Sequence, residues 1–196
     1  MTNHLALDLH NIEAVVVGAS AGGMKALECV LSTLPQDFPK PIMVVLHRSK
    51  SNKSLLEHIF DRKCKMKVPI VEDKMPILPG HIYFGPQDYH MLIEPDNTIS
   101  LCVSEPVNYS RPAIDLLFES AAEVYSKNLL GIVLTGGNTD GSDGLLKIQQ
   151  NGGKVIVQDP ELSENTTMPR AAIEKTKTGS IMSLHGINET LQNIRL

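Results

Sequence analysis

The stretch Val15-Val16-Val17-Gly18-Ala19-Ser20-Ala21-Gly22-Gly23 decides the fold that we expect for this chain. Its valines favour a buried parallel strand, its glycines allow a tight turn, and the apolar spacing of residues 24–31 predicts a helix directly afterwards. Ser20 lies on the predicted turn, beside the free N–H groups of that helix. A serine in this place suits either an anion-binding turn or a hydroxyl that attacks a carbonyl group.

Composition narrows the class of protein. The chain has 196 residues, of which 42% are hydrophobic, so we expect a short N-terminal extension at residues 1–11 and a single domain at residues 12–196. A net charge of -4 with scattered lysines and arginines argues against nucleic-acid binding. Three cysteines without metal-like spacing favour a reducing compartment. Because no signal peptide or membrane-spanning segment is evident, we expect a cytoplasmic protein without membrane insertion.

Strand and helix patterns alternate along most of the chain. Apolar runs predict further strands at residues 41–46, 129–134, 154–158 and about 180–184. Amphipathic patterns predict helices at about 54–60, 112–125 and 143–150, one opened by Pro169 and one at the C-terminus. Short strand-like pieces separated by turns occur at 68–71, 81–84, 90–93 and 98–101. The sequence therefore predicts an α/β fold with a doubly wound, mostly parallel, Rossmann-like three-layer sheet and an antiparallel excursion around residues 68–102.

Three polar residues follow the predicted parallel strands. Ser20 follows the first strand, His47 closes the second, and Asp140 lies in the polar turn after residues 129–134. Because the carboxyl ends of parallel strands share one edge, the three side chains should lie together, as nucleophilic acyl transfer requires. Residues 18–23 also match half of a dinucleotide-binding fingerprint, but His47 stands where an acid should hold the ribose, which disfavours nucleotide binding.

Motifs in a fixed order make the resemblance to a known family specific. They are Gly18-Ala19-Ser20-Ala21-Gly22-Gly23 after the valine strand, the histidine closing the second strand, Leu78-Pro79-Gly80-His81-Ile82-Tyr83, Arg111-Pro112-x-x-Asp115-x-Leu117-Phe118, Leu134-Thr135-Gly136 with Asp140-Gly141, and Met168-Pro169-Arg170-x-Ala172-Ile173. Together they resemble the catalytic domain of the chemotaxis protein-glutamate methylesterase (CheB) family, from about residue 12 to 175 or beyond.

The resemblance implies a serine hydrolase that converts γ-glutamyl methyl esters of chemoreceptors to glutamate and methanol and also deamidates receptor glutamines. It implies Ser20 as nucleophile, His47 as general base and Asp140 as the acid that orients it. The backbone N–H groups of Ala21 and Gly137 fall at the family's oxyanion-hole positions. We expect no cofactor and no metal.

Several positions depart from the family's pattern. Gly137 stands where methionine is usual, Asn138 where glycine is usual and Ala21 where threonine is usual. We expect Asn138 to be tolerated because asparagine adopts positive φ more readily than most residues. Residues 48–52 lack the usual Met-Pro continuation, so the substrate-facing loop should differ. Arg48 and Arg111 are candidate substrate-facing residues.

The resemblance also names partners. These are the cytoplasmic helices of methylated chemoreceptors and, because residues 1–11 leave no room for a receiver domain, a separate receiver or regulatory protein. We expect the chain to be either a stand-alone esterase or an excised catalytic domain, and both alternatives predict activity without phosphorylation. The departures leave open a second hypothesis, a catalytically weak relative that binds a receptor or signalling partner.

Each candidate residue also has a purely structural interpretation. Ser20 could cap the next helix, Asp143 could compete with Asp140 or cap its own helix, and Arg111 could pair with Asp115 one helical turn away. The remaining histidines that we considered lack metal-ligand spacing and are expected to be structural or surface residues, namely His58, His81, His90 and His185.

Overall fold

A parallel sheet of six strands forms the centre of the molecule. We describe residues 7–48 and 56–194 of a computed structural model. The strand order is β4-β2-β1-β7-β8-β9, and every neighbouring pair is parallel. The strands are β1 (Ala14–Ala19), β2 (Ile42–Leu46), β4 (Ile82–Phe84), β7 (Leu129–Val133), β8 (Lys154–Gln158) and β9 (Ile181–Met182). The chain adds strands outward in one direction from β1 and then in the other from β7, so the predicted doubly wound fold is confirmed.

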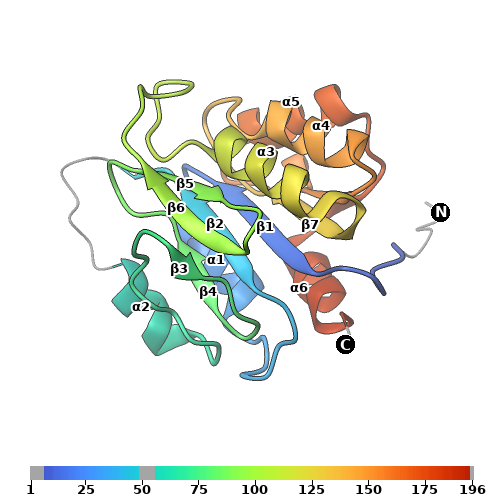
Figure 1. The fold of residues 1–196 in the computed structure, drawn as a ribbon. Helices are drawn as coiled ribbons and strands as arrows, with labels where there is room; N and C mark the ends of the chain where they lie inside the picture. Colours follow the sequence, from blue (N-terminus) through green and yellow to red (C-terminus); the bar gives the residue numbers. More distant parts are fainter. Residues whose placement is uncertain (1–6, 49–55, 195–196) are drawn as a thin grey trace.

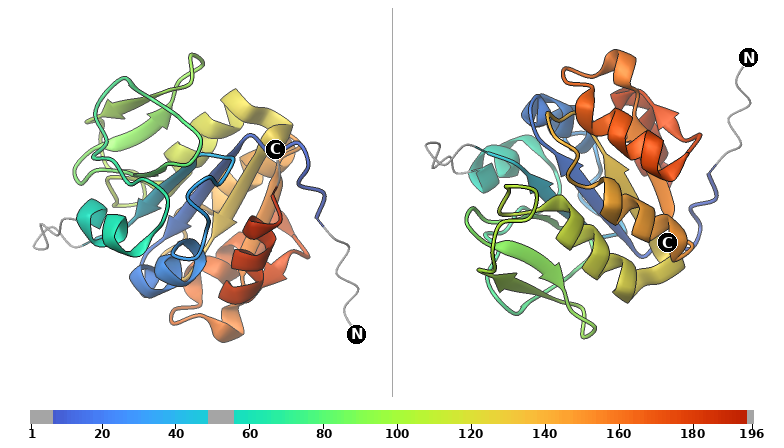
Figure 2. Two further views of the ribbon diagram at one scale, coloured as in Figure 1. Left: turned by 90° about the horizontal axis from the view of Figure 1, so that it is seen from below. Right: turned by 90° about the horizontal axis from the view of Figure 1, so that it is seen from above.

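Helices cover both faces of this sheet (Figure 1). On one face lie α1 (Gly23–Leu31), α2 (Leu56–Lys63) and α6 (Leu184–Gln192), and on the other lie α3 (Ile114–Tyr125), α4 (Ser142–Gln150) and α5 (Thr167–Thr176). Figure 2 shows the first group in front of the sheet from below and the second group from above. Two short 3₁₀ helices, η1 (Ser126–Asn128) and η2 (Pro160–Leu162), complete the helical elements of the described residues.

The valine strand explains why both faces need helices. All six residues of β1 are buried, and their side chains alternate between the two cores. Val15, Val17 and Ala19 belong to the core under α1 and α6, whereas Ala14 and Val16 belong to the core under α3. A strand with apolar side chains on both faces is stable only between two layers of helices, which is the arrangement of parallel sheets.

A smaller antiparallel sheet packs beside α3. It has the order β3-β6-β5, formed by β3 (Met75–Pro76), β6 (Thr98–Cys102) and β5 (His90–Ile93). The Ser120 hydroxyl of α3 accepts a hydrogen bond from Ile93 N at 3.1 Å. The predicted antiparallel excursion is therefore present.

Two pieces of the predicted excursion differ in the structure. Residues 81–84 do not join the antiparallel sheet, because Ile82, Tyr83 and Phe84 are all buried and β4 pairs in parallel with β2. A continuous apolar run suits a buried parallel strand better than a half-exposed antiparallel one. Residues 68–71 form no strand, and only the neighbouring Lys67 makes an isolated bridge, to His81.

Other boundaries move by a few residues for local reasons. Helix α5 begins at Thr167 rather than Pro169, because proline in a first helical turn needs no N–H donor. The last strand ends at Met182, since the Ser183 side chain caps α6 by accepting from Gly186 N. Residues 54 and 55 of the predicted second helix lie outside the described residues. Within the described ranges, no helix is long and apolar enough to cross a membrane.

Candidate active site

Ser20, His47 and Asp140 lie at one edge of the sheet. Ser20 follows β1, His47 follows β2, and Asp140 lies in the loop between β7 and α4. Backbone hydrogen bonds continue the sheet past the strand ends, from Ser20 N to Thr135 O at 2.9 Å and from His47 N to Ala19 O at 3.0 Å. The sheet reverses its winding between β1 and β7, which is where ligands bind in open α/β sheets.

Asp140 is a buried carboxylate with four donors. Its Oδ2 atom accepts from His47 Nε2 at 2.8 Å and from Ile114 N at 2.7 Å. Its Oδ1 atom accepts from Asp115 N at 3.1 Å and from Asn108 Nδ2 at 3.3 Å. Burial alone would raise the pKa of Asp140, but the hydrogen bonds from His47, Ile114 and Asp115 and the attraction of His47 hold this pKa below its usual value. Asp140 is therefore ionised at neutral pH.

The contact with Asp140 decides which imidazole nitrogen remains available. Because Nε2 of His47 donates to Asp140, Nδ1 carries the free lone pair. This arrangement is the reverse of that in chymotrypsin-like proteases, where Nδ1 faces the acid. Nδ1 lies 3.4 Å from the side-chain amide of Asn138, whose Oδ1 accepts from Asp140 N at 3.3 Å. Among the described residues, no hydrogen bond joins the Ser20 hydroxyl to His47 in this state.

The turn after β1 presents Ser20 and a free backbone donor. Gly22 has a φ of 80° and is the N-cap of α1, and α1 has no side-chain cap, so Ser20 does not act as one. A Cβ on Gly22 would lie 2.8 Å from the Glu164 Cβ, so the turn requires glycine. The N–H groups of Ala21 and Gly137 have no hydrogen-bond partner within the described part of the chain. Both are available to a bound oxyanion.

The Gly137-Asn138 segment differs from our expectation. Asn138 does not adopt positive φ, so its tolerance does not depend on the left-handed conformation and the position does not demand glycine. A Cβ on Gly137 would meet Asn165 Nδ2 at 3.5 Å, an ordinary contact. The loop does require glycine at Gly141, which has a φ of 92° and whose added Cβ would lie 2.6 Å from Ile114 Cγ2. The backbone N–H of Gly137 therefore remains available as a donor although residues 137 and 138 differ from the family's pattern.

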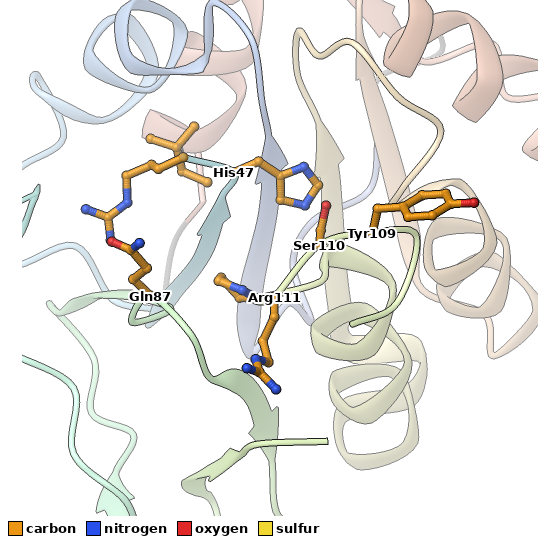
Figure 3. Close-up of a pocket in the computed structure, with 8 residues that line it drawn as sticks. His47, Gln87, Tyr109, Ser110 and Arg111 are labelled. Carbon is orange, nitrogen blue, oxygen red and sulfur yellow. The ribbon is translucent and has the colours of Figure 1, made fainter. Parts of the chain in front are cut away.

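Two hollows flank His47. One has a volume of about 250 Å³ and is lined by Leu46, His47, Arg48, Gln87, Tyr109, Ser110, Arg111 and Pro112. Figure 3 shows the Ser110 hydroxyl turned toward the imidazole ring. The other, of about 260 Å³, contains Ser20 and is lined also by Gly22, Gly23, Met24, Lys25, Leu46, His47, Arg48 and Glu164. Arg48 lines both hollows, and residues 49–52 of the altered loop lie outside the described residues. A substrate can therefore approach His47 from the side of Ser20.

Arg111 does not pair with Asp115. Its Nη1 atom donates to Val103 O and Ser104 O, both at 2.9 Å, and in Figure 3 its side chain points away from His47. Asp115 instead accepts from Gly144 N at 2.7 Å and from Asn108 Nδ2 at 2.9 Å. The helical spacing that suggested the ion pair is overridden by these tertiary contacts.

Asp143, His81 and His90 have structural roles. Asp143 is exposed in the first turn of α4 and pairs with Lys175 at 2.6 Å, so it does not compete with Asp140. Nδ1 of His81 contacts Pro79 O, and His90 contacts Ala113 N and Glu105 O. The described ranges contain no group of three or more residues that could hold a metal ion.

Sequence reasoning missed the polar residues that surround Asp140. Asn108 donates to both Asp115 and Asp140, and Asp115 lies beside the Asp140 carboxyl. Asp115 could have been suspected, because it is the acid of the Arg-Pro-x-x-Asp motif and an acid on an otherwise apolar helix face needs partners. No sequence signal pointed to Asn108, because its contacts depend on how the loop folds back.

Comparisons with known proteins identify relatives of this chain. Residues 15–191 match the family described as CheB methylesterase. The crystal structure of the Thermotoga maritima CheB methylesterase catalytic domain superposes with a TM-score of 0.88 at 32% identity, covering 92% of this chain and 97% of that one.

Relatives with assigned names give the same result. A Leptospira interrogans protein, provisionally named as a protein-glutamate methylesterase/protein-glutamine glutaminase, is 46% identical over 179 residues, which cover 91% of this chain and 93% of that protein. The Thermotoga maritima protein-glutamate methylesterase/protein-glutamine glutaminase is 33% identical over 180 residues, 90% of this chain but 52% of that longer protein. The chain belongs to the CheB methylesterase family.

Proposed function

We propose that this protein hydrolyses γ-glutamyl methyl esters of chemoreceptors by a Ser20-His47-Asp140 mechanism. The observation that carries the proposal is the pairing of His47 Nε2 with the buried Asp140 carboxylate at 2.8 Å, which leaves Nδ1 as a base at the edge where Ser20 lies. A buried carboxylate in this position fixes the tautomer and stabilises the imidazolium that forms during attack.

His47 acts first as a general base and then as a general acid in the proposed reaction. His47 Nδ1 takes the Ser20 proton as Oγ attacks the ester carbonyl, and the N–H groups of Ala21 and Gly137 stabilise the oxyanion. The tetrahedral intermediate then expels the methoxy group, which receives the proton from His47 and leaves as methanol. Water, deprotonated by His47, cleaves the acyl-enzyme and releases the glutamate carboxylate. With a glutamine side chain the same steps release ammonia, which would account for deamidation.

Arg48 is the substrate-facing cation in this proposal. It lines the hollow that contains Ser20 as well as the one on the other side of His47, so an acidic receptor helix that presents its ester to Ser20 must pass it. Arg111 has a different role, because its guanidinium is committed to the carbonyls of Val103 and Ser104. We propose that Arg111 holds the loop that carries Asn108.

Methanol release from a methylated receptor fragment tests the function. Ser20→Ala should lower the rate by about 10⁴ to 10⁶, the cost of losing a nucleophile in comparable enzymes. Ser32→Ala, at the C-terminal end of α1, is a matched control and should retain full activity. Equal rates for Ser20→Ala and the unmodified protein would refute the mechanism.

A second function is favoured by one contact. The Asn138 amide lies 3.4 Å from His47 Nδ1, the nitrogen that must act as base. A hydrogen bond from this amide would occupy the lone pair that the base needs. The protein would then bind receptor helices but hydrolyse their esters slowly or not at all. Tight binding of the methylated fragment with methanol release at background would support this second function over hydrolysis.

A further inference from the structure

A second buried carboxyl group stands directly behind the acid of the proposed triad. Asp115 is 5% exposed, at the start of α3, and Asp140 is fully buried. The backbone N–H of Asp115 donates to Asp140 Oδ1 at 3.1 Å. The Asn108 side-chain amide spans the pair, donating to Asp115 Oδ2 at 2.9 Å and to Asp140 Oδ1 at 3.3 Å.

The donors are divided unequally between these carboxyl groups. Asp140 accepts from four groups, including His47, whereas Asp115 accepts only from Gly144 N and Asn108 Nδ2 among the described residues. Two neighbouring buried carboxylates repel each other, so the one with fewer donors takes up a proton first. Burial, and next the contacts with Asp140, raise the pKa of Asp115 to about 7 despite its hydrogen bond from Gly144, while the pKa of Asp140 is lowered.

We propose that Asp115 is a positioning residue of this site: it shares a proton with the Asp140 carboxylate at low pH and, when that proton leaves to solvent, adds a second negative charge behind His47. The proposal rests on the proposed function only for its effect on turnover. An ionised Asp115 favours the imidazolium form of His47, which is the form that arises during attack on the ester.

The other charged groups around Asp115 do not replace this effect. Asp143 on α4 adds negative charge, but it is exposed and paired with Lys175 of α5. Glu119, one turn further along α3, has a raised pKa, first because of burial and then because of Asp143. On β5, burial lowers the pKa of His90, which keeps this ring neutral. The acid that shares a donor with Asp140 is therefore Asp115, through the Asn108 amide.

Nuclear magnetic resonance of the free protein tests the proposal without substrate. The nitrogen shifts of the His47 ring and the carboxyl carbon shift of Asp115 are followed from pH 4 to 9 in the unmodified protein, in Asp115→Asn and in the control Asp143→Asn. Asp115 should titrate near neutral pH, and the His47 curve should show a second step at the same pH. In Asp115→Asn this step should vanish and the midpoint of His47 should fall by about one pH unit, because a unit charge within about 12 Å has an effect of this size at an effective dielectric constant of about 20.

The titration curves of Asp115 and His47 can uphold or overturn the proposal. An Asp115 carbon that titrates near its ordinary value of about 4, or a His47 curve unchanged by Asp115→Asn, overturns the proposal. If Asp115→Asn does not fold, the two curves of the unmodified protein still decide it. Asp143→Asn should leave the His47 curve in place, and an equal shift there would mean that general surface charge is responsible. A two-step His47 curve in a protein that releases no methanol would uphold the carboxyl pair and refute the esterase.

Discussion

Replacing Asp140 with asparagine should damage stability and catalysis together. Asp140→Asn keeps the shape of the side chain but puts an NH₂ group where one carboxylate oxygen was. Each oxygen accepts two hydrogen bonds, Oδ1 from Asp115 N and Asn108 Nδ2, and Oδ2 from Ile114 N and His47 Nε2. Whichever way the amide turns, two donors face another donor. A hydrogen bond to a charged acceptor is worth about 1.5–3 kcal/mol, so the variant should lose about 3–6 kcal/mol of unfolding free energy.

The catalytic loss has a separate cause. In Asp140→Asn, a side-chain amide that donates to His47 Nε2 would force the proton onto Nδ1, and the imidazole could then no longer accept the proton of Ser20. The same replacement in a serine protease lowers kcat by about 10⁴, and we expect a loss of that order. Urea unfolding followed by circular dichroism and methanol release are measured on one preparation. Asp143→Asn, which alters an exposed acid three residues further along the chain, should stay within about 0.5 kcal/mol and retain its activity. A folded Asp140→Asn protein with activity within about tenfold of the original would show that Asp140 does not orient His47.

Three further perturbations have definite expected results. Asn138→Gly should speed the labelling of Ser20 by a fluorophosphonate by about 2- to 5-fold. The substitution removes an amide that competes with Ser20 for His47 Nδ1 through a hydrogen bond worth about 0.5–1 kcal/mol. Slower labelling would mean instead that Asn138 holds the imidazole ring in place. Gly131→Ala should lower the unfolding free energy, measured in urea, by about 1–3 kcal/mol, because the added Cβ would lie 2.6 Å from Ile148 Cδ1. Gly179→Ala is the matched control, since its Cβ would have nothing within 4 Å. Because the pKa of Asp115 is raised, the folded state binds more protons than the unfolded state, and the contribution of Asp115 to stability falls as pH rises from about 4 to about 7. The unfolding free energy of Asp115→Asn, measured by urea unfolding across this range, should lack this decline. The same pH dependence in both proteins would contradict the prediction.

The parallel sheet could be predicted because its signal is local. Runs such as residues 14–19 are apolar on both faces and end in a turn that needs glycine at Gly22. The placement of β4 could not be predicted in the same way. Its three residues sit between turn residues that resemble those of the antiparallel pieces, and only the free edge of β2 decides that it pairs there.

The candidate site was predictable in part for a related reason. Strand ends are defined by the local pattern, so Ser20, His47 and the loop of Asp140 could be brought together on topology alone. Side-chain contacts across loops depend on packing over long separations. The amide of Asn108 reaches Asp140 from 32 residues away, and the amide of Asn138 meets His47 from 91 residues away. Neither contact has a signature in the sequence.

The reversed use of the imidazole follows from the order of the strands. His47 stands at the end of β2 and Asp140 comes from the loop after β7, with β1 and Ser20 between them. Strands two places apart are separated by about 9–10 Å, so the histidine must span the width of β1 to meet the acid. Nε2 is the ring nitrogen further from the backbone and can reach across to Asp140, so Nδ1 is left without the acid. We therefore expect Ser20, at the end of β1, to use Nδ1, whereas a triad built on another topology can use the nitrogens in the opposite sense.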